Sequence, residues 1–423
     1  MKMPQERRQR YISYYLFFYF GVMHFLVIVQ MLSGRNFRVF WIVDAVAVFS
    51  IFLSLVYIAR YLKTHAGKLA KLDFYVLAYL GWSLFSVFFY LQKGNPASLV
   101  AYFYGVHYLV FPIFLYFAVK RLDWLFQKPL LKNICYLHVF LFLVGLFMLY
   151  WRPAFYTEFL RTNIMSPYPG LSDWQLYGRM QSYLGSTTIA LLAGVTAVLL
   201  NIFEIPAWKK VGMISACLFA GVLTQQRGGF VAVAVGGLYF ILTKKQKILM
   251  KLVSTTTAAL LLLLSFSFFN NRTVAIGHRR ALTDYIKERL VKHTIQGNPL
   301  QERISGYRNG LENVLRFPLG LGLGATTSAA DLAQANLGGQ VVDANYMRIL
   351  SDLGLPGLSL FLFINGAVLW SLRKKPNRFA FMAALAIYGI VALGTNVFDH
   401  YYMGHFYWLL VGIMTSRQAA VTT

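Results

Sequence analysis

The chain has 423 residues, of which 58% are hydrophobic and 13% are charged, and its formal net charge is +25. A soluble domain usually carries about 25% charged residues, so this composition excludes an ordinary soluble protein. Runs of about 20 mostly apolar residues recur along the whole length, as in proteins that cross a membrane many times. The sequence therefore predicts an all-α, polytopic integral membrane protein.

The apolar runs predict about twelve membrane-spanning helices. In chain order they lie near residues 11–33, 39–59, 73–92, 98–119, 133–151, 187–205, 211–225, 228–243, 250–269, 356–372, 379–398 and 404–416. The first run is too long and too aromatic for a cleaved signal peptide, so we expect it to be retained as a span.

This division gives three parts. Residues 1–269 hold nine spans and a shorter outer segment at 152–186, residues 270–345 form a long outer loop, and residues 346–423 hold a re-entry segment and the last three spans. Two cysteines lie inside apolar runs and indicate neither a disulfide nor a metal site.

The distribution of lysine and arginine predicts the orientation. With a cytoplasmic N-terminus, 23 of the 40 basic residues fall in cytoplasmic segments: four each in 1–10, 60–71, 120–132, 244–251 and 373–378, two at 209–210 and one in the tail. This positive-inside pattern places both termini in the cytoplasm. Cationic inner loops that face anionic lipid account for much of the charge, so it does not call for nucleic acid.

The long loop at 270–345 contains a predicted helix. Long loops are usually functional or disordered, but Asn298-Pro299-Leu300-Gln301 has the form of a helix start. Apolar residues then recur at helical spacing: Leu300, Ile304, Tyr307, Leu311 and Leu315.

Arg303, Gly306 and Gly310 lie beside that apolar stripe, three and four residues apart. They would put a guanidinium next to a surface without side chains, where a ligand can approach closely. An ordinary surface arginine on a helix weakened by glycine explains the spacing equally well.

Arg227 lies in TQQRGGF, between two apolar runs and at the predicted outer end of the seventh span. An arginine at a span end can simply extend to the interface. The two glutamines before it and the two glycines after it indicate a tight polar turn, which favours a guanidinium that is buried or faces a cavity.

Arg179 precedes the sixth span, in YGRMQSYLGSTT, again on the predicted outer side. Arginines from three distant parts of the sequence, Arg179, Arg227 and Arg303, thus reach one membrane face. Guanidinium groups bind phosphate through two parallel, charge-assisted hydrogen bonds. A diphosphate at the outer lipid interface is the partner that this pattern predicts.

The order of three motifs resembles the superfamily of O-antigen ligases and O-antigen polymerases, which are bacterial envelope enzymes. YGRMQSYLGSTTIALLAGV resembles the family's arginine-containing segment, and LTQQRGGFVAVAVGGL resembles its Ser-Arg-Gly signature, with Gln226 where serine is common. RISGYRNGLENVLRFPLGLGLG and then DANYMRILSDLGLPGL resemble its loop arginine, glycine-rich turn and re-entry into the membrane. The motifs cover residues 175–360, and the first five spans match only in being hydrophobic.

The resemblance implies a metal-independent glycosyltransferase without a cofactor, with a GT-C-like helical fold, at the periplasmic face of the bacterial inner membrane. Its donor would be an oligosaccharide on undecaprenyl diphosphate, held by Arg179, Arg227 and Arg303. The last two would also stabilise the leaving diphosphate. Implied partners are lipid-linked oligosaccharides as donor and acceptor, membrane lipids, a chain-length regulator and a flippase, and no nucleic acid.

Asp343, in VVDANYMRIL, stands where the ligases of this family carry a histidine that activates the acceptor hydroxyl. An aspartate can accept that proton, but its reference pKa of about 3.9 makes it a weaker base. It could instead orient a sugar or pair with Arg348. The missing histidine favours a polymerase, which joins lipid-linked repeat units, over a ligase that transfers glycan to lipid A-core.

Other polar residues are candidates for lesser roles. Asp399, His400 and Tyr401 lie in the last predicted outer turn and could line a sugar site, although aromatic residues are also common at the interface. His138 lies within a span, where we expect it to form hydrogen bonds in the core.

A transporter or flippase for lipid-linked oligosaccharides is the rival class. Transporters typically show internal repeats and interrupted helices that meet near the membrane midplane. The sequence shows no convincing repeat, and its candidate charges gather at one face, which favours chemistry at an interface.

Overall fold

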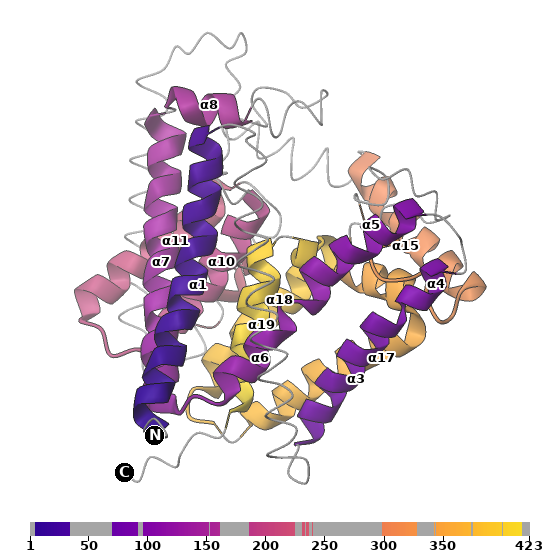
Figure 1. Cartoon of the computed structure of the whole chain (residues 1–423). Coiled ribbons are helices and arrows are strands. Elements are labelled where there is room, and N and C mark those ends of the chain that lie inside the picture. The colour runs from indigo at the N-terminus through magenta and orange to yellow at the C-terminus, as the bar shows by residue number, and fades with distance from the viewer. Residues whose placement is uncertain are drawn as a thin grey trace.

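A computed structural model describes the greater part of the chain. The described residues are 5–33, 70–91, 96–151, 153–160, 186–224, 231–232, 234–236, 239, 298–327, 342, 344–373, 375–399 and 401–416. Every regular element among them is a helix (Figure 1).

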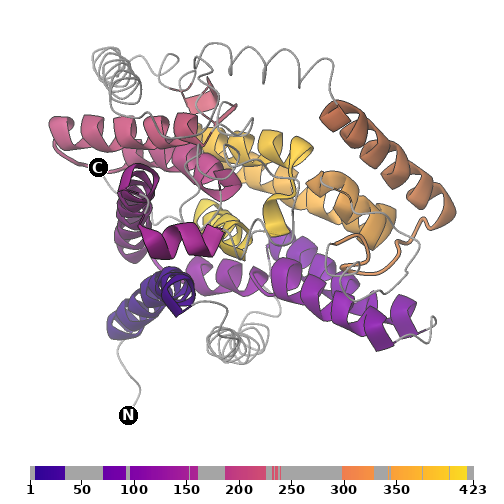
Figure 2. The ribbon, with the colours of Figure 1, turned by 90° about the horizontal axis from the view of Figure 1, so that it is seen from above.

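The first group of helices contains two long neighbours that run in the same direction, and the helices that follow them (Figure 1). α1 (Gln5–Ser33) lies against α7 (Trp124–Trp151), and α8 (Ala154–Leu160) crosses their upper end (Figures 1 and 2). α10 (Ser186–Leu199) continues into the short 3₁₀-helix η3 (Leu200–Ile202). α11 (Ala207–Leu223) returns along α10.

The second group consists of interrupted helices. One residue, Ser86, separates α3 (Lys71–Phe85) from α4 (Val87–Leu91). A single span is built from three consecutive elements: α5 (Pro96–Gly105), the π-helical turn η1 (Val106–Val110) and α6 (Ile113–Lys120). π-helical turns of this kind are rare and often occur at functional sites.

The C-terminal group holds the loop helix and the last spans. α15 (Asn298–Arg316) lies beside α17 (Asn345–Leu372), as Figure 2 shows for the two orange helices. α18 (Arg378–Gly394), the short η6 (Val397–Asp399) and α19 (Tyr401–Thr415) complete it.

The core is built around α10 and α19. Residues 188–200 and 402–414 are buried without exception, so both helices are enclosed on every side, as expected for helices that are apolar all round. α10 packs on α11 and α18, and α19 packs on α6. Gly412 permits the second contact, because a Cβ atom there would lie 2.8 Å from the carbonyl oxygen of Tyr116.

Among the described residues, four helical segments are long and apolar enough to cross a membrane: Lys71–Phe89, Leu99–Lys120, Trp124–Leu149 and Asn345–Leu372. The chain is therefore a multi-pass membrane protein. Helices also occupy the other predicted spans that the structure describes, while the predicted spans near 39–59 and 250–269, and most of 228–243, lie outside the described residues. The number of twelve spans stays a prediction.

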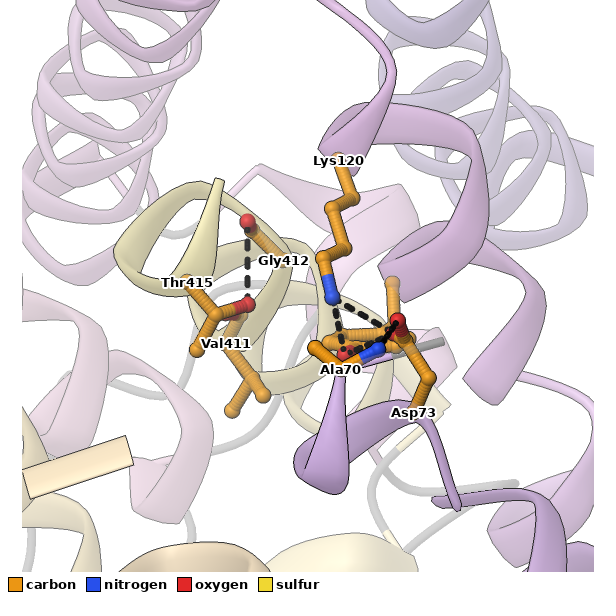
Figure 3. Close-up of polar contacts among 7 residues, drawn as sticks. Ala70, Asp73, Lys120, Val411, Gly412 and Thr415 are labelled. Carbon is orange, nitrogen blue, oxygen red and sulfur yellow. Dashed lines mark hydrogen bonds and ion pairs between the residues drawn. The ribbon is translucent and has the colours of Figure 1, made fainter. Parts of the chain in front are cut away.

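A polar cluster joins α3 to α6 at one end of the molecule (Figure 3). Asp73, in the first turn of α3, accepts hydrogen bonds from the Tyr116 hydroxyl at 2.6 Å and from the Lys120 ammonium at 2.5 Å. Its second oxygen accepts from the backbone N–H of Ala70 at 3.1 Å. The last turn of α19, which contains Thr415, lies next to this cluster.

Further contacts fasten other helix ends to the same end of the bundle. These are Gln9 Nε2 to Asp123 Oδ2 at 2.8 Å, Ser416 Oγ to Gln127 Oε1 at 2.9 Å, Lys375 Nζ to the Ser416 carbonyl at 2.7 Å, and Lys128 Nζ to Glu204 Oε1 at 2.8 Å. The described parts of the segments predicted to be cytoplasmic thus gather at one end, here called the basic end. That this end faces the cytoplasm stays a prediction.

Candidate functional site

At the end of the bundle away from the basic end, the loop helix α15 packs on the beginning of α17. Gly310 makes the close approach possible, because a Cβ atom there would already lie 3.3 Å from Met347 Cβ and 3.5 Å from Ser351 Oγ. Three residues earlier, the Tyr307 hydroxyl donates to the backbone carbonyl of Leu393, near the end of α18. α15 is therefore held against two membrane helices.

A glycine-rich turn follows α15 and passes between α17 and α5. Gly320, Gly322 and Gly324 all have positive φ, at 99°, 111° and 89°. A Cβ atom at Gly324 would lie 2.1 Å from the carbonyl oxygen of Ala101, and one at Gly320 would lie 2.4 Å from that of Asp352. Only glycine fits these positions, since both the conformation and the space exclude a side chain.

The carboxylate of Asp352 organises this turn. One oxygen accepts the backbone N–H of Gly324 at 2.9 Å, and the other accepts the backbone N–H and the hydroxyl of Thr326 at 2.9 and 2.8 Å. Arg348 lies one helical turn earlier, with Nε 3.6 Å from Asp352 Oδ2, and both side chains are 0% exposed. A buried ion pair of this kind is costly to break.

α17 is interrupted at Gly354, where φ is +67° and the backbone leaves the helical conformation. A Cβ atom at Gly354 would lie 2.3 Å from the carbonyl oxygen of Pro318. The segment after the break, residues 355–372, is about 27 Å long as a helix, close to the thickness of the hydrocarbon core. The break therefore lies at one end of the span and not at its middle.

The carbonyl groups that the interruption frees are all satisfied by other parts of the chain. Ser351 O accepts the N–H of Leu321 and Asp352 O accepts the N–H of Gly322, each at 2.9 Å. Leu353 O accepts the indole N–H of Trp82 at 2.7 Å. These partners replace the hydrogen bonds that the helix loses at the break.

Arg303 lies within α15, about two helical turns before Gly310. Gly310 lies beside Met347 and Ser351, while Pro318 is bonded to Leu355. α15 and α17 therefore run in the same direction, and the N-terminal half of α15 extends toward the N-terminal end of α17.

Asp343 lies outside the described residues, but the residues on either side of it are described. Val342 and Ala344 are buried, and the N–H of Val342 donates to the Thr326 carbonyl at 3.4 Å. Thr326 is also the residue that Asp352 holds. The residue before Asp343 is thus tied to the glycine-rich turn. Arg348 is a possible ion-pair partner of Asp343 by sequence, and in the structure it pairs with Asp352.

The segment that contains the predicted sugar-binding residues reaches the same region. Asp399 ends η6 and Tyr401 begins α19, while His400 lies outside the described residues. The backbone N–H of Phe398 lies 3.5 Å from Asn345 Oδ1, in a long hydrogen bond to the first residue of α17.

Arg179 and Arg227 lie outside the described residues. α11 ends at Leu223, four residues before Arg227, and α10 begins at Ser186, seven residues after Arg179. The connection between α10 and α11 lies at the basic end, where Glu204 meets Lys128. α10 therefore begins, and α11 ends, away from the basic end.

His138 was expected to form hydrogen bonds in the core, and this prediction is confirmed. Its Nδ1 lies 2.8 Å from Thr196 Oγ1 and its Nε2 lies 2.8 Å from the Tyr402 hydroxyl. The sequence reasoning missed Asp352, although an acidic residue in an apolar helix, four residues after an arginine, is itself a signal. Among the described residues, no group of three His, Cys, Asp or Glu side chains could hold a metal ion.

These features define a multi-pass membrane protein with a helical loop and a glycine-rich turn packed on an interrupted span. Residues 212–362 match the sequence profile of the Wzy_C family, described as O-antigen ligase, and the chain contains a domain of this O-antigen ligase/polymerase family. The match begins in α11 and ends in α17, and so includes the positions of Arg227, Arg303 and Asp343 but not Arg179. A search of curated proteins finds no match. Members of the family are enzymes of lipid-linked polysaccharide assembly, and their substrates are lipid-linked glycans.

Proposed function

We propose that this protein is a surface-polysaccharide polymerase that joins undecaprenyl-diphosphate-linked repeat units at the periplasmic face of the bacterial inner membrane. The observation that carries this proposal is the packing of α15 on the start of α17. Gly310 and Tyr307 hold the helix of Arg303 against Met347 and Leu393. The flanks of Asp343 and the segment that ends at Asp399 adjoin the same region.

In this mechanism a sugar hydroxyl of the acceptor attacks the anomeric carbon of the donor. A new glycosidic C–O bond forms, and the bond from that carbon to the diphosphate oxygen breaks, so that the diphosphate leaves with the electron pair. Arg227 and Arg303 bind the developing negative charge, and Arg179 helps to hold the diphosphate. Asp343 accepts the hydroxyl proton or orients the hydroxyl.

Two features support chemistry at an interface over transport. The interruption of α17 lies at one end of the span, and transporters use interrupted helices near the midplane. Within the described chain, the segments that adjoin the predicted site residues all lie at the end away from Lys375 and Glu204.

The second candidate is the O-antigen ligase, because that is the description of the matching family. The difference lies in the acceptor, which is a second lipid-linked repeat unit for a polymerase and lipid A-core for a ligase. Asp343, in place of the histidine of the ligases, favours the polymerase.

The direct test supplies purified protein with a lipid-linked repeat unit alone and examines the products by gel electrophoresis. A polymerase produces a ladder of glycans on the lipid, whereas a ligase leaves the repeat unit unchanged until lipid A-core is added and then transfers a single unit to it. Deleting the gene provides the cellular counterpart. Loss of a polymerase leaves single repeat units on the surface anchor, and loss of a ligase leaves long chains on the carrier lipid.

Asp343→Asn refines the mechanism, because it keeps the shape of the side chain and removes its charge. A base role predicts a loss of turnover of about 10²-fold or more, and a purely orienting role predicts a smaller loss. Normal turnover in a protein that folds and inserts normally would exclude both roles.

A further inference from the structure

The turn between α17 and α18 concentrates positive charge at the basic end and is here called the basic turn. It consists of residues 373–378, with the sequence RKKPNR, so four of its six residues are lysine or arginine. The two spanning segments that flank it, residues 355–372 and 378–394, contain no acidic residue. The charge of the basic turn therefore has no counterpart in the helices that it joins.

Hydrogen bonds give the basic turn a defined conformation. The backbone N–H of Lys375 donates to the carbonyl of Leu372 at 3.0 Å, and that of Arg378 donates to the carbonyl of Lys375 at 3.2 Å. The Lys375 ammonium donates to the carbonyl of Ser416, just after the end of α19, at 2.7 Å. The Arg378 guanidinium donates through Nη1 to the carbonyl of Arg373 at 3.0 Å. Because the turn is already ordered, a ligand that binds it loses less affinity to the ordering of side chains.

Each exposed arginine of the basic turn lies over an exposed aromatic ring. Cζ of Arg373 is 4.0 Å from the centre of the Trp370 ring, and Cζ of Arg378 is 4.8 Å from the centre of the Phe379 ring. Tryptophan at the end of a span is typical of the level of the lipid headgroups. A guanidinium stacked on a ring still has N–H groups at its edge, and these can bind a phosphate through two parallel hydrogen bonds.

The two arginines differ from other cations at the basic end in their electrostatic surroundings. Lys120 is neutralised by Asp73, which lies 2.5 Å away. Among the residues that the structure describes, no carboxylate forms an ion pair with Arg373 or Arg378. Two uncompensated positive side chains in one short turn raise its potential, so an anion that binds there is electrostatically favoured.

A strip of exposed apolar side chains leads from each stacked pair into the membrane-spanning part of the bundle. On α17, Leu369 and Leu362 lie four and eleven residues before the stacked arginine, and on α18, Met382 and Ile390 lie three and eleven residues after the stacked phenylalanine. These spacings place each strip on one face of its helix. Hydrocarbon chains can lie along such strips, so one molecule with a charged head and apolar tails matches both the turn and the helices.

We propose that the basic turn binds the headgroup of an anionic phospholipid, with Arg373 and Arg378 as ligands of its phosphate and the acyl chains on the two apolar strips. A soluble phosphate compound has no chains that could use the strips. A zwitterionic phospholipid carries its own cation and leaves the charge of the turn uncompensated. The proposal does not depend on the polymerase function, because the basic turn lies at the end of the bundle away from the candidate site.

The test compares the dissociation constants of dioleoyl phosphatidylglycerol and dioleoyl phosphatidylcholine, measured by native mass spectrometry of the full-length protein in an uncharged detergent. The two lipids share their acyl chains and their phosphate, but only phosphatidylglycerol has a net charge. We expect Arg373→Gln and Arg378→Gln each to weaken phosphatidylglycerol binding about fivefold and to change phosphatidylcholine binding little. Both side chains are exposed, so the unfolding midpoints of the variants should match that of the wild type.

Arg7→Gln, in the first turns of α1, is the matched control. Arg7 is exposed at the same basic end, and its Cζ lies 5.8 Å from the centre of the exposed Tyr11 ring. The control variant loses the same single charge as the two turn variants, so it weakens the general attraction of the protein for anions to the same extent. We expect its phosphatidylglycerol binding to stay close to that of the wild type.

Equal losses in all three variants would overturn the proposal, because anionic lipid would then be attracted by the overall charge of the protein. Unchanged binding in both turn variants would overturn it as well. Glycerol phosphate, added at the same concentration as phosphatidylglycerol, should not displace the lipid, and displacement would assign the basic turn to a soluble phosphate compound instead. Because the measurement involves no catalysis, its outcome is separate from that of the glycan-ladder assay.

Discussion

Asp352 and Thr326 are 26 residues apart in the sequence, yet two hydrogen bonds join them, from the backbone N–H and the hydroxyl of Thr326 to one carboxylate oxygen of Asp352. The other oxygen receives the N–H of Gly324 and faces Arg348. Asp352, on the interrupted helix α17, therefore shapes the glycine-rich turn that precedes this helix in the sequence. Since the N–H of Val342 donates to the Thr326 carbonyl, the flank of Asp343 depends on the same residue.

Asp352→Asn should destabilise the protein strongly, because it leaves the buried guanidinium of Arg348 without its carboxylate and removes an acceptor from the turn. Losing one partner of a buried ion pair costs about 3–5 kcal/mol. The measurement is the thermal unfolding midpoint in detergent. The control is Glu312→Gln, which removes the exposed ion pair with Arg308 and should cost less than about 1 kcal/mol. Equal midpoints for both variants would refute the structural role of Asp352.

Gly324→Ala should also be destabilising, for a different reason. Its φ of +89° is unfavourable for alanine, and the added Cβ would meet the carbonyl oxygen of Ala101 at 2.1 Å. We expect a loss of at least about 1–3 kcal/mol from the backbone strain alone. Gly212→Ala is the control, because this position in α11 has nothing within 4 Å and should gain up to about 1 kcal/mol. A neutral Gly324→Ala would mean that the turn is less constrained than its geometry indicates.

The helical loop shows how far the sequence could predict this region. The helix start at Asn298 is confirmed by α15, but most of the apolar stripe that predicted the helix, apart from Tyr307, is not its packed face. Ile304, Leu311 and Leu315 are exposed, whereas Gly310 lies against α17. A glycine contributes no hydrophobic signal, although it allows the closest approach, so periodicity identified the helix without identifying its contact.

The candidate site was predictable only in part. The family resemblance and the order of the arginines placed Arg303 and Asp343 in one region, and the contacts at Gly310 and Val342 are consistent with this. The link between Asp352 and the glycine-rich turn was not predictable from local sequence. It depends on where two segments meet in space, which spacing along one helix cannot reveal.

The orientation of the bundle can be tested with introduced cysteines. Arg308 and Glu204 have side chains that are 80% and 92% exposed, on α15 and at the basic end respectively. Arg308→Cys should react with a membrane-impermeant maleimide added outside, and Glu204→Cys should react only after the membrane is permeabilised. The two natural cysteines, Cys135 and Cys217, are buried and should give no background. The reverse labelling pattern would place the site in the cytoplasm.

Lys375, in the turn between α17 and α18, should make stability depend on pH. Burial, reinforced by the positive charge of Lys120, lowers the pKa of Lys375 from 10.5 to about 8. Between those values the unfolded chain binds more protons than the folded one, so the free energy of unfolding rises with pH, by at most about 1.4 kcal/mol per pH unit. Below pH 8 the lysine is protonated in both states and its contribution is constant.

The measurement is the unfolding midpoint from pH 7 to 10, with the wild type compared with Lys375→Met. In Lys375→Met the unfolding midpoint should lack the increase with pH that Lys375 causes, because methionine does not titrate. Lys209→Met, at an exposed position in α11, should show the same increase as the wild type. If the wild type and Lys375→Met show the same slope, Lys375 is protonated across the range.

Arg303→Lys tests whether the loop arginine binds a diphosphate, and α15 supplies its own control. A lysine keeps the charge but cannot form the two parallel hydrogen bonds of a guanidinium, so we expect polymer synthesis to fall by about 10²-fold. Arg308→Lys, five residues along the same helix, changes an exposed arginine paired with Glu312 at 2.9 Å and should leave synthesis nearly unchanged. Unfolding midpoints of both variants should match the wild type, which separates a loss of chemistry from a loss of fold. Equal activity of the two variants would show that Arg303 acts as an ordinary surface residue, and the diphosphate would then need other ligands.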